Sequence, residues 1–147
     1  SRMIAPNSDA RIAEEQSTMD VDVAARRLVA IGALSAGLGV AAGAFGAHSL
    51  KDILDQHLLD VYEKATRYQM YHAFGMVLSG LAVQFWRDAG AAKAGWLFLG
   101  GTLLFSGSLY GVSLLGVRWL GAVTPIGGLL FIAGWVMLGW RAWRGAS

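Results

Sequence analysis

Four long apolar stretches without a charged side chain make up most of this sequence and restrict what it can fold into. They cover residues 28–47, 68–86, 94–117 and 119–140. Each is close to the roughly 20 residues that a helix needs to cross a hydrocarbon core about 30 Å thick. Because backbone groups in lipid must bond within their own segment, we predict helices and not an open sheet. The expected fold is an all-α membrane protein, with four transmembrane helices in a compact bundle.

The composition argues against most catalytic classes. The chain has 147 residues, 55% of them hydrophobic, so one membrane domain over 28–144 leaves no room for a soluble catalytic module. The absence of cysteine excludes disulfides, thiolate metal sites and cysteine nucleophiles. The apolar stretches contain no paired carboxylates, no histidine cluster with metal-ligand spacing and no Ser–His–Asp set. We expect no enzyme activity, no metal and no cofactor, although a bound lipid is compatible with this composition.

The charged residues predict an orientation in the membrane. The net charge of +2 is too small to indicate a nucleic-acid partner, and membrane lipids are the expected surroundings. One side would carry six basic residues: Arg26, Arg27, Arg87, Lys93, Arg141 and Arg144. The other would carry four: Lys51, Lys64, Arg67 and Arg118. The excess predicts both termini on the cytoplasmic side of a bacterial inner membrane, or on the matrix side of a mitochondrial inner membrane.

Residues 1–27 differ from the rest because they are polar and mixed in charge, with a faint helical pattern through Ile12, Met19 and Val23. We predict a polar tail that is disordered when alone, and other membrane subunits as its partners. The sequence does not begin with Met. Residues 1–18 are therefore either what remains after a targeting segment is processed or an addition upstream of a start at Met19.

Residues 50–66 form an amphipathic segment between the first two stretches. An i, i+3, i+4, i+7 pattern begins at Leu50 with Ile53, Leu54 and His57, and acidic and basic residues fill the opposite face. Ser49 followed by Asp52 resembles an N-terminal cap. The segment is predicted to be a helix that lies along the membrane surface.

A seam of small residues runs along the first stretch. Its members recur at spacings of four, three, four and three, a mean period of 3.5 residues that keeps them on one face of a left-handed crossing. Small residues let two helices approach closely, which matters in lipid because no hydrophobic force drives helices together there. The seam can face the bundle or a second subunit, and both remain open. Its residues are Gly32, Ala36, Gly39, Gly43 and Gly46.

Two histidines are candidate functional residues. His48 follows the first stretch and His72 lies about one turn inside the second, which enters from the same side. We expect them at similar depths, beside Tyr68 and Tyr71. An ionisable group in a membrane is costly enough that a function is a reasonable first hypothesis.

Hydroxyls on the third stretch complete the candidate polar cluster, because Thr102, Ser106 and Tyr110 share one helix face. The favoured interpretation is a structural hydrogen-bond cluster. One alternative is haem ligation by the paired histidines, against which the shallow position of His48 argues. The other is a proton or ion path along His72 and the hydroxyls, against which the lack of charged residues in all four stretches argues.

Five short motifs carry a resemblance to a known family. In order they are Gly-Ala-Phe-Gly-Ala-His at 43–48, Tyr-Gln-Met-Tyr-His-Ala at 68–73, Leu-Phe-Ser-Gly-Ser-Leu-Tyr at 104–110, Val-Thr-Pro-Ile-Gly-Gly at 123–128 and Ala-Gly-Trp at 133–135. From about residue 28 to 140, the chain resembles the small membrane proteins of domain-of-unknown-function family 423. That family includes bacterial inner-membrane members and the eukaryotic transmembrane protein 256. The resemblance implies a four-span membrane protein and no reaction; His48 and His72 match motif positions.

The leading functional hypothesis is a non-enzymatic accessory subunit that packs on a larger membrane complex through the tail and the small-residue seams. One alternative is a small channel or transporter for protons or a solute, which a wide hydrated cavity reaching His72 and Ser106 would favour. A lipid-binding membrane protein is the other, and an exposed cleft able to hold an acyl chain would favour it.

Overall fold

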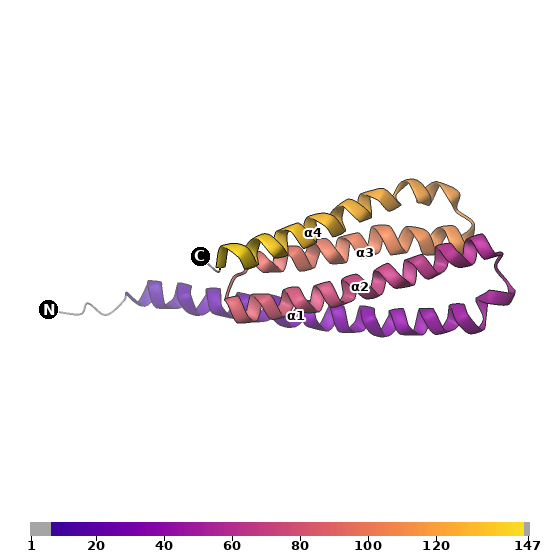
Figure 1. Cartoon of the computed structure of the whole chain (residues 1–147). Helices are drawn as coiled ribbons and strands as arrows, with labels where there is room; N and C mark the ends of the chain where they lie inside the picture. Colours follow the sequence, from indigo (N-terminus) through magenta and orange to yellow (C-terminus); the bar gives the residue numbers. More distant parts are fainter. Residues whose placement is uncertain (1–6, 146–147) are drawn as a thin grey trace.

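The computed structural model describes residues 7–145. Its four helices are α1 (Ser8–His48), α2 (Gln56–Trp86), α3 (Gly90–Leu115) and α4 (Thr124–Gly145). Two short 3-10 turns, η1 (Leu50–Asp52) and η2 (Arg118–Ala122), lie in the connections. The helices alternate in direction, and each packs against the next along the chain (Figure 1). Both ends of the described chain therefore lie at the same end of the bundle, and the all-α fold is confirmed.

The packing order makes α2 and α3 the central helices. Each of them contacts two neighbours extensively, whereas α1 and α4 lie at the two sides and pack mainly against one. The largest side chains that are fully buried come from α1, α2 and α3: Leu28, Met76, Val83 and Phe98. Large apolar side chains on the outer faces, such as Leu34 on α1 and Leu129 on α4, are exposed. This pattern is typical of a bundle whose solvent is lipid.

Three of the described helices are long and apolar enough to cross a membrane: α1, α3 and α4, the first and last with their adjoining 3-10 turns. The prediction of four such stretches is wrong for the second, 68–86, which is part of α2. That segment carries Gln69, His72 and Ser79, which are buried. A helix enclosed by neighbours can carry more polar groups than a lipid-facing one, because the bundle supplies their hydrogen-bond partners.

The predicted surface helix over 50–66 is also corrected. Residues 56–66 are the first turns of α2, which continues unbroken to Trp86, and only the short turn η1 precedes it. No glycine or proline interrupts the chain between Gln56 and the second stretch, so nothing ends the helix there. The helix begins at Asp55, whose carboxylate accepts a hydrogen bond from the Leu58 N–H at 2.9 Å. Ser49 and Asp52, the expected cap, lie before it.

The predicted polar tail over 1–27 is helical from Ser8 onward, and residues 1–6 lie outside the described chain. Once a helix has formed over 28–47, each added residue is easily incorporated, and no glycine or proline occurs from Ser8 to Ile31. Val21 and Ala25 are buried, whereas residues 8–20 are exposed throughout. The tail therefore divides into a segment packed on the bundle and a helical extension beyond it, here called the extension (residues 8–20).

The third and fourth predicted stretches need smaller corrections. α3 ends at Leu115, because Gly116 adopts a left-handed φ of 69° that glycine tolerates. Residues 119–122 belong to η2, so the last helix begins at Thr124, later than the expected 119. Pro125 lies in its first turn, where a missing N–H costs little.

The seam of small residues faces α2 at three of its five positions. A Cβ added at Gly32 would lie 2.7 Å from the carbonyl oxygen of Ala73, and one at Gly46 would lie 2.6 Å from the Tyr62 ring. Gly39 is buried against α2 as well. Ala36 is half-buried, and a Cβ at Gly43 would meet nothing within 4 Å. The glycines spaced seven residues apart thus set the close approach of α1 to α2.

We predict opposite effects for two Gly→Ala substitutions on α1. Gly32→Ala forces its methyl group against the Ala73 carbonyl and should reduce the free energy of unfolding by about 1–3 kcal/mol, as overpacking does. Gly43→Ala meets open space and should be neutral or stabilise by up to about 1 kcal/mol, because alanine favours a helix. Unfolding in detergent, followed by circular dichroism, checks both. Equal effects at the two positions would contradict the close approach.

Candidate functional site

His72 lies deep in the bundle, with only 4% of its surface exposed. Its neighbours on α2 fix its level: Gln69 lies against Gly39, and Ala73 against Gly32. His72 is therefore opposite residues 32–39 of α1, close to the middle of the uncharged stretch 28–47. This depth makes an ionised imidazole costly, and a neutral ring is the form that the surroundings accept.

His48 lies far from His72, and the expectation of similar depths is wrong. His48 is exposed at the end of α1, two residues beyond Gly46, which packs on Tyr62. Ten residues of helix separate Tyr62 from His72, which is about 15 Å at 1.5 Å per residue. The two histidines therefore do not form a pair that could hold one iron between them.

One ring nitrogen of His72 has a partner and the other does not. Nδ1 lies 2.7 Å from the carbonyl oxygen of Tyr68, one turn earlier in α2. A carbonyl only accepts, so in this hydrogen bond Nδ1 carries the proton and Nε2 of the neutral ring keeps a free lone pair. Within residues 7–145, Nε2 has no hydrogen-bond partner, yet it is not among the fully buried atoms that lack one. It therefore reaches an accessible surface.

That surface is a groove between α2, α3 and α4 with a volume of about 700 Å³, here called the histidine groove. The Phe131 ring stacks on the imidazole with 3.4 Å between centroids and 5° between planes. Tyr71 and Trp135 at the mouth are about half exposed. The opening thus faces the outer side of the bundle. The principal lining residues are Tyr68, Tyr71, His72, Phe105, Phe131 and Trp135.

A separate set of hydrogen bonds links α1, α2 and α3. Tyr110 donates its hydroxyl to Gln69 Oε1 at 2.7 Å, and Gln69 Nε2 donates to the Ser35 carbonyl at 2.9 Å. The Ser106 hydroxyl donates to the Ala65 carbonyl at 2.8 Å. Among residues 7–145, no buried side-chain nitrogen or oxygen lacks a partner. The polar side chains on this side of α2 therefore find their hydrogen-bond partners within the bundle.

The predicted polar cluster is therefore divided into separate parts. Tyr68, Tyr71 and His72 line the histidine groove, whereas Ser106 and Tyr110 of α3 donate hydrogen bonds to Ala65 and Gln69 of α2. Thr102 donates to the Phe98 carbonyl of its own helix at 2.8 Å. His48 joins none of these.

Gln69 and three aromatic residues around His72 were not among the site residues predicted from the sequence. Gln69 could have been predicted, because a glutamine in an apolar stretch needs hydrogen-bond partners for its amide. Phe98, Phe131 and Trp135 gave no such signal, since aromatic residues are common in every membrane helix. Only the packing of α3 and α4 against α2 brings these three rings to one histidine.

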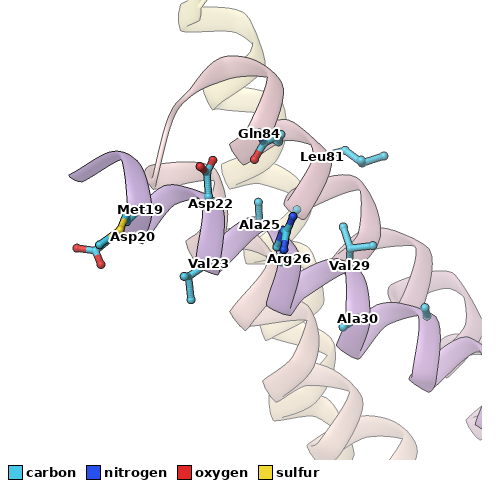
Figure 2. A pocket seen from close by; sticks show the side chains of 12 residues that line it. Met19, Asp20, Asp22, Val23, Ala25, Arg26, Val29, Ala30, Leu81 and Gln84 are labelled. Carbon is cyan, nitrogen blue, oxygen red and sulfur yellow. The ribbon is translucent and has the colours of Figure 1, made fainter. Parts of the chain in front are cut away.

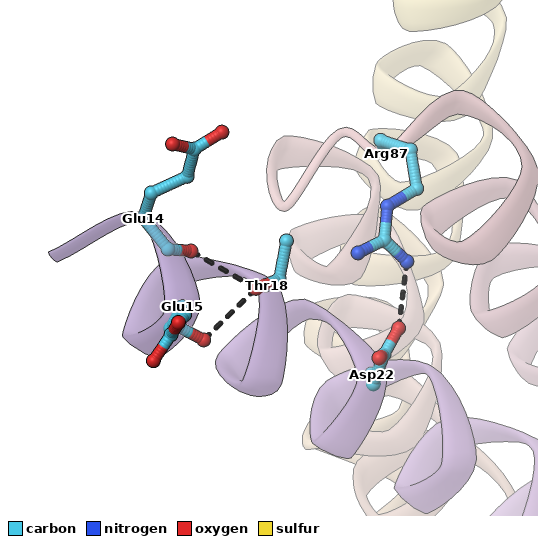
Figure 3. A network of polar contacts seen from close by, with 5 residues as sticks. All are labelled: Glu14, Glu15, Thr18, Asp22 and Arg87. Atoms are coloured by element: carbon cyan, nitrogen blue, oxygen red, sulfur yellow. Dashed lines mark hydrogen bonds and ion pairs between the residues drawn. The ribbon is translucent and has the colours of Figure 1, made fainter. Parts of the chain in front are cut away.

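Within the described part of the chain, two ion pairs lie at the end of the bundle that holds both chain ends. Arg87, which ends α2, donates to Asp22 of α1 at 2.6 Å (Figure 3). Arg141 of α4 lies 3.3 Å from Asp88 in the connection before α3. Asp22 lies outside the uncharged stretch 28–47, and its hydrogen bond to Arg87 lowers the pKa of its carboxyl below the ordinary value of 3.8. These pairs tie α1 and α4 to the α2–α3 connection.

A second groove lies beside the first ion pair, where α1 leaves the bundle (Figure 2). Its volume is about 750 Å³, and α1 and α2 form its walls. Its apolar lining includes Met19 of the extension and Val23, and its charged lining residues are Asp20, Asp22 and Arg26. It is here called the terminal groove. Its lining is mostly apolar, and the exposed face of α1 continues from it into the extension.

The long apolar helices and their internally paired polar groups define an all-α membrane protein. The chain belongs to the family of proteins of unknown function called DUF423, whose model matches residues 42–128. It is 49% identical over 110 residues to a UPF0382 membrane protein of Staphylococcus epidermidis, an alignment covering 75% of this chain and 89% of that protein. UPF0382 membrane proteins of Staphylococcus haemolyticus (48%; 75% and 89%) and Staphylococcus saprophyticus (47%; 75% and 91%) are similarly close. No solved structure matches the chain.

Tyr110→Phe should destabilise the bundle, because it leaves the side-chain oxygen of the buried Gln69 without its donor. We expect a loss of about 1–2 kcal/mol in the free energy of unfolding. Tyr71→Phe is the matched control: the same atom is removed from an exposed ring, and the change should stay below about 0.5 kcal/mol. Unfolding of both variants in one detergent is the measurement. A Tyr110→Phe protein as stable as the Tyr71→Phe protein would show that the link to Gln69 contributes nothing.

The Asp22–Arg87 pair predicts a pH dependence at this end of the bundle. Because the folded-state pKa of Asp22 is lowered, its stabilisation is present above pH 3.8 and is lost as pH falls through the folded-state pKa. Asp22→Asn should lower the melting temperature slightly at pH 7 and bring the variant and the original chain together at low pH. The effect is small because both side chains are partly exposed. Asp20→Asn serves as the control, and a difference that persists at low pH would argue against the ion pair.

Proposed function

We propose that this chain is a non-enzymatic accessory subunit of a larger complex in the inner (cytoplasmic) membrane of a bacterium, with both termini on the cytoplasmic side. The bacterial source of the named relatives supports the location. The excess of Lys and Arg at the end that holds both chain ends supports the orientation.

The observation that carries the proposal is an unpartnered apolar stripe on α1. Ile12, Met19 and Val23 lie on one helix face, since steps of seven and four residues return close to the same angle. All three are exposed, at 59%, 62% and 45%. Met19 and Val23 also line the terminal groove, so the stripe runs from the extension onto the bundle. Because residues 8–20 are exposed throughout, only their continuity with the rest of α1 holds them helical, and a partner that covers the stripe would stabilise them.

The charges beside the stripe indicate the chemistry of the partner. Asp20 lines the terminal groove and has no ion-pair partner within the described residues. Glu14 and Glu15 add negative charge to the extension. A helix of another membrane subunit, with apolar residues facing the stripe and a Lys or Arg near the membrane surface, is complementary to this region.

Transport has less support. The hydroxyl of Ser106 and the amide of Gln69 bond to backbone or tyrosine groups and leave no polar lining for a water column on that side of α2. The histidine groove is lined mainly by aromatic rings and opens toward the outer side of the bundle. A lateral apolar groove favours a lipid-soluble molecule and not an ion.

The proposal is tested in the native host with the full chain, tagged at its C-terminus. Membranes are dissolved in mild detergent and separated on a native gel, where the chain should run in a complex much larger than itself. Met19→Asp introduces a charge into the centre of the stripe and should release the chain from that complex.

Leu115→Asp is the matched control, because Leu115 is 76% exposed at the other end of the bundle. It should leave the complex intact. A chain that runs alone before any substitution, or a complex that survives Met19→Asp and Leu115→Asp equally, would refute an accessory role through this stripe.

A further inference from the structure

We infer that the histidine groove is a binding site for a hydroxylated aromatic ring carried on an apolar chain, of the kind found in prenylated quinols. The site is distinct from the stripe on α1, because it lies between α2, α3 and α4. Nothing in the accessory role requires it.

His72, which lines the groove, has a free lone pair on Nε2. The side chain is 96% buried, as its exposed fraction is 4%, and Nδ1 is engaged by Tyr68. Nε2 can then only accept a hydrogen bond. Acyl chains contain no donor, and an acceptor left unpaired in apolar surroundings is unfavourable. The ligand must therefore bring an O–H or N–H group to this atom.

The walls of the histidine groove are mostly aromatic. Phe131 covers one face of the imidazole, with 3.4 Å between the ring centroids, and the ring centroids of Tyr68 and Phe105 are 4.6 Å apart. Trp135 and Tyr71 leave large parts of their rings exposed at the mouth. Aromatic walls favour a flat ring that can stack on them or meet their edges. The volume of about 700 Å³ is within the usual range for a ligand of this size.

A ligand can enter the histidine groove from the bilayer. The mouth is flanked by Phe74 and Ile132, both more than half exposed and apolar. A ring that enters from the bilayer can leave its apolar chain along these residues, in contact with lipid. A charged or strongly hydrated ligand would lose its water on this route without gaining a counter-ion, since the groove contains no charged residue.

The reduced and oxidised forms of one ring provide the test. Decyl-substituted benzoquinol carries O–H donors, whereas the corresponding quinone carries only acceptors. The full chain is placed in phospholipid nanodiscs, and binding is followed by quenching of tryptophan fluorescence and by ¹⁵N NMR of labelled histidine. We expect the quinol to bind about tenfold more tightly than the quinone, the effect of one hydrogen bond to a buried acceptor. Only the quinol should shift the Nε2 signal of His72.

Three variants make the test specific. His72→Phe keeps an aromatic ring but removes the acceptor, so the preference for quinol should disappear. Gly128→Leu adds bulk to the groove and leaves His72 in place, because a Cβ at residue 128 meets Phe105 at an ordinary 3.8 Å, and it should weaken the binding of both forms. His48→Phe changes an exposed histidine outside the groove and should change nothing.

The melting temperature of each variant shows that it is folded, and Gly128→Leu keeps the test valid if His72→Phe does not fold. Equal binding of quinol and quinone would overturn the inference. So would a preference that survives His72→Phe, or a His72 signal already shifted by water and indifferent to the quinol.

Discussion

The close approach of α1 to α2 is the contact on which the rest of the bundle depends. It is reciprocal: Gly32 of α1 lies under Ala73 and Val77 of α2, and Gly80 of α2 lies under the Ala25 carbonyl and Val29 of α1. In lipid, burying apolar surface gives little force between helices, so dispersion at short range and interhelical hydrogen bonds hold them together. A side chain at either glycine would separate the two backbones. The bond from Gln69 to the Ser35 carbonyl spans this interface and would be lost with it.

This contact also explains how α2 can carry an amide and an imidazole within its apolar stretch. A lipid-facing helix cannot carry an unpaired amide or imidazole at low cost, but α2 is enclosed between α1 and α3. Its polar groups are divided between two sides. Gln69 bonds to α1 and α3, where its partners are complete, whereas His72 turns toward α4 with one nitrogen still free. The interior toward α1 is therefore structural, and the side toward α4 is the one able to receive a ligand.

The two proposed surfaces use different physics and lie on different elements. The stripe on α1 is long, apolar and edged by acidic residues, which suits a helix of another subunit. The histidine groove is lined mainly by aromatic rings and contains no charged residue, and Nε2 of His72 has no hydrogen-bond partner, which suits a small ring. The membership of the chain in DUF423 extends across residues 42–128 and so includes His72, Phe105 and Gly128, but not the extension. The walls that α2 and α3 give to the groove are thus within the part that the family model matches, whereas Phe131 and Trp135 of α4 lie beyond that part, as does the extension.

The sequence alone determined that the chain lies in a lipid bilayer and is all-α, because uncharged stretches near bilayer length permit few other folds. It also determined the family, because the ordered motifs are specific. It also indicated the seam of small residues, since a 3.5-residue period can be recognised from the order of the residues alone. It did not reveal that 56–86 is one helix, that residues 8–27 continue α1, or that His48 and His72 lie far apart. Those facts depend on where each helix begins and ends and on how the helices pack against one another. The groove depended on tertiary structure most of all, because its rings come from three helices and only their packing shows that Nε2 of His72 has no partner.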